Sequence, residues 1–123
     1  MEKLDLQALG LRALNKKLQS QTDETNQKDW EIINPRGSHA IAVGVDAPIN
    51  VMVRGSTGYY CGGMNKQAHI HVDGSAGPGV AENMMSGTVT THNQIARLRH
   101  KGTHMTNIAM YNNVDTLHRN ATT

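Results

Sequence analysis

The sequence predicts an all-β fold, namely a short right-handed parallel β-helix (solenoid) that follows an N-terminal amphipathic helix and precedes an irregular C-terminal tail. Three observations predict it: an internal repeat of 19 residues, a concentration of glycines between Gly37 and Gly87, and a shortage of large aromatic side chains. Phe is absent and Trp30 is the one tryptophan, so branched aliphatic residues have to fill the core. The expected units are 1–29 (helix and linker), 30–91 (β-helix coils) and 92–123 (a tail expected to be disordered).

The composition excludes several classes of protein. A chain of 123 residues with 37% hydrophobic and 18% charged residues is long enough for one folded domain. The formal net charge of +2, without a basic stripe interleaved with aromatic residues, does not indicate nucleic-acid binding. One cysteine, Cys61, excludes an internal disulfide framework. The sequence shows neither a secretion signal nor an apolar run of membrane-spanning length, so we expect a cytoplasmic protein.

Residues 4–19 are predicted to form the amphipathic helix. Leu11, Leu14 and Leu18 recur at helical spacing, with positively charged residues on the other faces. The polar residues 21–29 have the composition of an exposed linker.

Short apolar runs follow the linker. Residues 30–33 form the first run, and the Asn-Pro-Arg-Gly sequence at 34–37 predicts a turn. Residues 41–45 are predicted to form a strand, which ends at the Asp-Ala-Pro sequence of 46–48.

The internal repeat begins near Ile49 and defines the predicted coils. After a shift of 19 residues, VMVRGSTG aligns with IHVDGSAG, so that apolar residues match apolar residues and glycines match glycines. The alternating residues Val51, Val53, Ile70 and Val72 predict strands with one buried face. A unit this short buries its apolar face only against its neighbours, so we expect the copies to stack as layers roughly 4.8 Å apart.

The repeat weakens in a third copy and then stops. Val89 and Thr91 occupy the expected strand positions, but Asn93 and Ala96 stand where the pattern requires glycines. Residues 103–123 are rich in Asn, Thr and His and show no periodicity, which is typical of a segment without a packed structure. We therefore expect a truncation or a reading-frame change near residues 90–93, with an unpaired strand edge as its consequence.

The glycine pattern and several separate motifs resemble one protein family. The second copy carries Gly-x-x-Gly-x-Gly in full at Gly74, Gly77 and Gly79, and the first copy matches two of these positions at Gly55 and Gly58. This pattern is similar to that of the glutamate-synthase-type GXGXG β-helix family. The chain further resembles the N-terminal half of the β-helix subunit of methylamine–glutamate N-methyltransferase (N-methylglutamate synthase) in the runs LDLQALGLRALNKKL, HAIAVGVDAPI, GYYCGGMN and GVAENMMSGTV.

The resemblance implies a non-catalytic scaffold subunit without catalytic, cofactor-binding or metal-binding residues of its own. It implies two partners, an amidotransferase-like subunit and an FMN-containing synthase subunit that also holds an iron–sulfur cluster. The family reaction converts glutamate and methylamine to N-methylglutamate and ammonia. Three alternatives stay open: a fragment of a glutamate synthase β-helix domain, a stand-alone binding module with a histidine-based metal site, and a nonfunctional fragment.

The glycines of the repeat are predicted to be structural turns rather than a ligand loop. Their order differs from the Gly-x-Gly-x-x-Gly of dinucleotide sites, no Gly-Lys-Ser/Thr follows, and Pro78 removes one backbone donor. The predicted turn residues are Gly55, Gly58, Gly74, Gly77 and Gly79.

Three other features are candidates for chemistry. His69 and His71 share one face of a strand with Asp73 and could bind a metal together, but the simpler interpretation is exposure to solvent. Cys61 has no charged neighbour to activate it, which favours a buried small residue over a nucleophile. The run ENMMS at 82–86 fits packing or a subunit contact better than catalysis.

Overall fold

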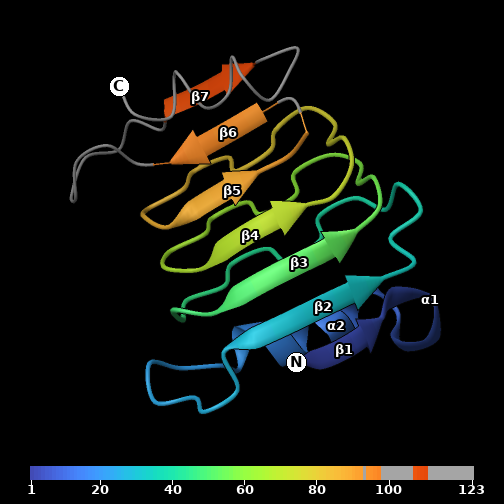
Figure 1. Cartoon of the computed structure of the whole chain (residues 1–123), viewed down its shortest axis with the longest axis vertical. Helices are drawn as coiled ribbons and strands as arrows, with labels where there is room; N and C mark the ends of the chain where they lie inside the picture. Colours follow the sequence, from blue (N-terminus) through green and yellow to red (C-terminus); the bar gives the residue numbers. More distant parts are fainter. Residues whose placement is uncertain (93, 98–106, 111–123) are drawn as a thin grey trace.

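The computed structural model describes residues 1–92, 94–97 and 107–110, which form one sheet with helices at its N-terminal end (Figure 1). The strands lie in the sheet in the order of the sequence. Strands β1 to β5 pair in parallel, whereas β5 with β6 and β6 with β7 pair antiparallel. The elements are β1 (Glu2–Asp5), α1 (Leu6–Leu9), α2 (Leu11–Gln19), β2 (Asp29–Ile33), β3 (Asn50–Arg54), β4 (His69–Val72), β5 (Thr88–Thr90), β6 (Gln94–Arg97) and β7 (Asn107–Met110).

The 19-residue repeat sets the register of the central strands. Val51 of β3 pairs with Ile70 of β4, and Val53 pairs with Val72. Ile70 pairs in turn with Val89 of β5. All five side chains point to the inner face of the sheet and are at most 2% exposed. The prediction that the two copies form equivalent neighbouring layers is therefore confirmed.

The predicted fold class, an all-β right-handed parallel β-helix, is wrong. The described residues form a single sheet with five parallel strands plus helices, an α/β-like arrangement. The physical reason is that each 19-residue unit contributes only one strand, and the rest of the unit runs through tight turns. The expectation of an irregular tail is corrected as well, because β6 and β7 lie in it and reverse the strand direction. The rest of that predicted tail, residues 98–106 and 111–123, lies outside the described residues, as does residue 93.

The predicted N-terminal helix is present, with a different start and an interruption. Leu4 belongs to β1, and the carboxylate of Asp5 caps α1 by accepting from the backbone N–H groups of Gln7 and Ala8. Gly10 separates the two helices with a φ of 85°, a conformation that glycine adopts without steric cost. In α2, two of the three leucines of the predicted apolar face, Leu14 and Leu18, are fully buried, whereas Leu11 is partly buried.

The predicted strand at residues 41–45 is wrong, because this segment is a chain of turns. Ala40, Ala42 and Gly44 have φ values of 56°, 58° and 68°. A strand requires negative φ at every residue, and every second residue here has the opposite sign. Ile41 and Val45 still point inward and are fully buried, which accounts for the apolar alternation that suggested a strand.

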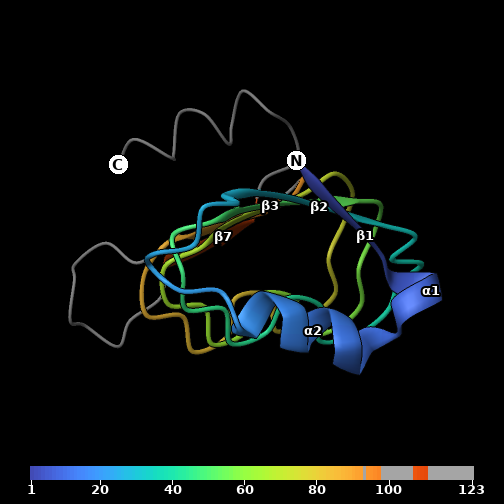
Figure 2. The same ribbon diagram turned by 90° about the horizontal axis from the view of Figure 1, so that it is seen from below.

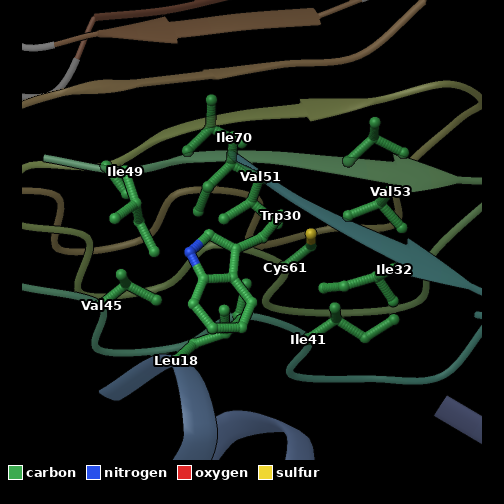
Figure 3. Packing of buried hydrophobic residues seen from close by; sticks show 14 of the residues in the cluster. Leu18, Trp30, Ile32, Ile41, Val45, Ile49, Val51, Val53, Cys61 and Ile70 are labelled. Atoms are coloured by element: carbon green, nitrogen blue, oxygen red, sulfur yellow. The ribbon is translucent and has the colours of Figure 1, made fainter. Parts of the chain in front are cut away.

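Trp30 lies where the helix meets the sheet. Figure 3 shows its indole ring among the side chains of Leu18, Val45 and Val51. Trp30 is 3% exposed, and its Nε1–H donates to the carbonyl oxygen of Gln27 at 3.0 Å. One buried core therefore joins the helical segment to the repeat.

Candidate functional site

Side-chain amides of helix α2 form hydrogen bonds with the backbone of the first turn segment, residues 40–44. Figure 2, seen from the N-terminal end, shows α2 on the side of the molecule opposite the sheet. Asn15 Nδ2 donates to the carbonyl oxygen of Ala40 at 2.8 Å, and Asn15 Oδ1 accepts from the backbone N–H of Ala42 at 2.8 Å. Gln19 Nε2 donates to the carbonyl oxygen of Val43 at 2.7 Å. The side-chain amides of Asn15 and Gln19 thus form hydrogen bonds with this backbone, in the way that the backbone of a neighbouring layer does elsewhere in the repeat.

Sequence reasoning missed these two residues. Asn15 and Gln19 each directly follow one of the buried leucines and lie four residues apart, so the helix presents them on one edge of its apolar face. A polar amide beside an apolar stripe is the signal that would have indicated this role.

The turn segments opposite the sheet repeat one unusual backbone pattern in three successive layers. Every second residue has a left-handed φ, between 54° and 76°, in the segments 40–44, 60–64 and 79–83. Backbone hydrogen bonds join the layers. For example, the N–H of Tyr60 donates to the carbonyl oxygen of Pro78, and the N–H of Gly62 donates to the carbonyl oxygen of Ile41. The residues with this φ are Ala40, Ala42, Gly44, Tyr60, Gly62, Met64, Gly79, Ala81 and Asn83.

The predicted turn glycines fall into two groups. Gly55 and Gly79 have φ values of 134° and 76°, which favour glycine. Gly58, Gly74 and Gly77 instead stand where an added Cβ would press on a neighbouring segment, and for Gly74 and Gly77 the atoms in the way are backbone atoms of the preceding layer at 2.9–3.0 Å. Close approach of the layers is therefore the physical reason for glycine at these three positions.

His69 and His71 lie on the outer face of the sheet, as exposed residues, each beside a threonine of β5. His69 Nδ1 lies 2.9 Å from the hydroxyl of Thr88, and His71 Nδ1 lies 2.6 Å from that of Thr90. Among the residues that the structure describes, no three His, Cys, Asp or Glu side chains gather as a metal site would require. Each histidine thus contacts a hydroxyl on the neighbouring strand.

A chain of alternating charges crosses the same face from β1 to the end of β5. Its ion pairs are Lys3–Glu31 at 3.6 Å, Arg54–Glu31 at 2.6 Å and Arg54–Asp73 at 3.8 Å, and the chain ends at a hydrogen bond between His92 Nε2 and Asp73 Oδ1 at 2.8 Å. The hydrogen bond from Arg54 is the main cause that lowers the pKa of Glu31, and the hydrogen bond from His92 is the main cause that lowers the pKa of Asp73. Because most of these side chains are well exposed, the chain of charges contributes little to stability.

Cys61 is a fully buried, free thiol in the turn segment of the first repeat unit. Burial raises its pKa to about 11, and the neighbouring hydroxyl of Thr57 opposes this rise only in part. A thiol with this pKa is almost entirely protonated at neutral pH and is a poor nucleophile.

The run at 82–86 divides between the core and the surface. Met84 is 1% exposed and belongs to the core, whereas Met85 is 46% exposed. Glu82 and Asn83 are exposed as well, and the carbonyl of Glu82 accepts from the backbone N–H of Met64, itself 44% exposed. The burial of Met84 agrees with the predicted packing role, whereas the subunit contact stays a prediction.

An open pocket of about 590 Å³ lies where the linker after α2 meets the next layers. The amide of Gln67 donates to the carboxylates of Asp23 and Asp46, both at 2.9 Å, and thereby ties the linker to the layers. The pocket is lined by Gln19, Gln21, Thr22, Asp23, Glu24, Asp46 and Gln67.

In the described part of the chain, no helix has the length and apolar character needed to cross a lipid bilayer.

Comparison with known proteins gives one informative match. The chain is 54% identical over 89 residues to Protein GlxC of Rhizobium meliloti (strain 1021). The match covers 72% of this chain and 39% of the relative, so the chain spans about two fifths of the length of the curated relative it matches. No family model and no solved structure matches the chain. The similarity to Protein GlxC fits a glutamate-synthase-related family.

Proposed function

We propose that this chain is a non-catalytic scaffold subunit of a glutamate-synthase-related enzyme complex that forms N-methylglutamate and ammonia from glutamate and methylamine. The observation that carries the proposal is the agreement between the similarity to Protein GlxC and the regular layering of the 19-residue repeat. The motifs that resemble the N-methylglutamate synthase subunit span the same layers.

The surroundings of the candidate catalytic side chains support a structural role. The thiol of Cys61 is buried with a raised pKa, and the rings of His69 and His71 are engaged by threonine hydroxyls. The interior between the sheet and the turn segments is filled by aliphatic side chains. A rigid layered body of this kind is suited to hold partner subunits in fixed positions.

The proposed partners are an amidotransferase-like subunit and an FMN-containing synthase subunit, and the FMN and the iron–sulfur cluster belong to the latter. We place the complex in the cytoplasm, and the free thiol of Cys61 is consistent with a reducing compartment.

Affinity purification of the tagged chain from its native host tests this function. The expected result is a stable complex with a flavoprotein, identified by mass spectrometry and by the absorbance of FMN, that converts glutamate and methylamine to N-methylglutamate. Purification of a well-folded chain without a flavoprotein would contradict the proposal. Omission of the chain from a reconstituted complex is the control, and it should reduce assembly of the other subunits.

A further inference from the structure

Two histidines of strand β4 form a pair on the face of the sheet that is turned away from α2 (Figure 2). His69 and His71 are two residues apart in the strand, so their side chains project from the same face. Both are exposed, whereas Ile70 between them is buried in the core. Within the residues that the structure describes, Nδ1 of each ring has a hydrogen-bond partner and Nε2 has none. The pair therefore offers two ligand nitrogens on one surface.

The threonines of β5 hold the two rings in equivalent ways. Thr88 pairs with His69 and Thr90 pairs with His71 across the parallel strands, and the distances from hydroxyl to Nδ1 are 2.9 Å and 2.6 Å. In the tautomer whose Nδ1–H donates to the hydroxyl, the lone pair of Nε2 is free. A histidine that binds a metal almost always donates its other ring N–H to a neighbouring group in this way.

The spacing along the strand is compatible with a chelate. Residues i and i+2 of a strand are roughly 6.6 Å apart, whereas two nitrogens that each lie about 2.0 Å from one ion are about 3 Å apart. Side chains lean along their strand in either of the two common χ1 rotamers, so opposite leans bring the two Nε2 atoms together. The threonine contacts run across the strands and leave this lean free.

The other histidines of the described residues use their ring nitrogens differently. His39 Nδ1 accepts from the backbone N–H of Tyr59 at 2.8 Å, so the proton of the neutral ring is on Nε2. His92 Nε2 lies 2.8 Å from a carboxylate oxygen of Asp73. Among the histidines that the structure describes, only His69 and His71 therefore combine a held Nδ1 with a free Nε2 on a shared face.

We propose that His69 and His71 bind one divalent transition-metal ion through their Nε2 atoms, with water in the remaining positions. Imidazole nitrogen suits Cu²⁺, Ni²⁺ and Zn²⁺, whereas Mg²⁺ and Ca²⁺ prefer oxygen ligands. No third His, Cys, Asp or Glu joins the pair within residues 1–92, 94–97 and 107–110, so the site is open, unlike a closed structural zinc site. Tetragonal Cu²⁺ suits nitrogen and water ligands and binds most tightly in its series. The inference does not depend on the proposed function.

The test is titration of the full chain with Cu²⁺, followed by calorimetry and by electron paramagnetic resonance. We expect the spectrum to show splitting from two imidazole nitrogens. H69Q and H71Q should each lower the affinity about a hundredfold, because a single imidazole binds without its chelating partner. Both positions are exposed, so thermal unfolding should show that each variant keeps the fold.

A second variant tests whether the threonines orient the rings. T88V/T90V keeps the shape of both side chains and removes their hydroxyls, and we expect it to bind Cu²⁺ about tenfold more weakly than the wild type. The controls remove histidines elsewhere, three of them outside the described residues, and should bind like the wild type. They are H92Q and H100Q/H104Q/H118Q.

Two results would overturn the inference directly. One is equal Cu²⁺ affinity in the wild type, H69Q and H71Q, and the other is loss of binding in H100Q/H104Q/H118Q, which would assign the ion to other histidines. Unchanged affinity in T88V/T90V would show adventitious binding by exposed histidines only, and it would overturn the oriented site as well.

Discussion

Replacement of Asn15 by alanine tests whether α2 closes the first turn segment through hydrogen bonds. The change removes the bonds to the carbonyl of Ala40 and the N–H of Ala42, each 2.8 Å long. Ala42 is fully buried, so its N–H would lose its partner without access to water. A buried backbone group without a partner costs about 1–3 kcal/mol, and the hydrogen bond lost at the partly exposed Ala40 costs about 0.5–1.5 kcal/mol, so the two losses together cost roughly 1.5–4.5 kcal/mol.

A gain in helix propensity offsets part of this cost. Alanine is about 0.6 kcal/mol more favourable than asparagine inside a helix. We therefore expect Asn15→Ala to lower the free energy of unfolding by roughly 1–4 kcal/mol. For a domain of this size that corresponds to a decrease in the melting temperature of about 10 °C.

The assay is thermal and urea unfolding followed by circular dichroism. The matched control is Gln19→Ala, which removes one bond, to the carbonyl of Val43, at an exposed position. Water can replace that bond, so we expect a loss of about 0.5–1 kcal/mol. If Asn15→Ala unfolds within about 2 °C of the wild type, or is more stable than Gln19→Ala, the described role of Asn15 is refuted.

Three further predictions follow from single contacts. Gly58→Ala should destabilise the chain by more than about 3 kcal/mol in urea unfolding, because the new Cβ would overlap the carbonyl of Gly37; Gly37→Ala, which meets nothing within 4 Å, should cost only about 1 kcal/mol of backbone strain. Cys61, with a pKa of about 11, should react with a thiol reagent only after denaturation, and rapid labelling of the folded chain would contradict its burial. The lowered pKa of Glu31 contributes stability that is present above its ordinary value of 4.5 and is lost as the pH falls through the lower folded value. Glu31→Gln, measured by melting temperature against pH, should therefore weaken the acid dependence, and an unchanged profile would refute the role of the Arg54 pair.

The central register of the sheet was predictable from the sequence. The spacing of 19 residues is sufficient to align Val51 with Ile70 and Val53 with Val72, and these residues are paired in the sheet. The apolar side of α2 was predictable for a similar reason, since Leu14 and Leu18 recur at helical spacing. Both follow from local periodicity, because a residue type that recurs with the period of an element marks the face that the element buries.

The path of the chain between strands was not predictable in this way. Ile41 and Val45 alternate with other residues as a strand would, yet their segment is a series of turns. Inward and outward alternation arises both in a strand and in a backbone whose φ changes sign at every second residue, so side-chain pattern alone does not separate the two. The prediction of a β-helix was wrong here because it took this alternation as the sign of a strand.

By itself, the sequence determined the repeat length, the strand register, the buried aliphatic residues and the amphipathic helix, because these depend on spacing along the chain. Only the tertiary structure decided that each unit supplies one strand, that the strand direction reverses after β5, and that Asn15 bonds the backbone at Ala40 and Ala42. The bonds of Asn15 join groups that are 25 and 27 residues apart in the sequence, and a donor or acceptor leaves no periodic pattern in the sequence around its distant partner.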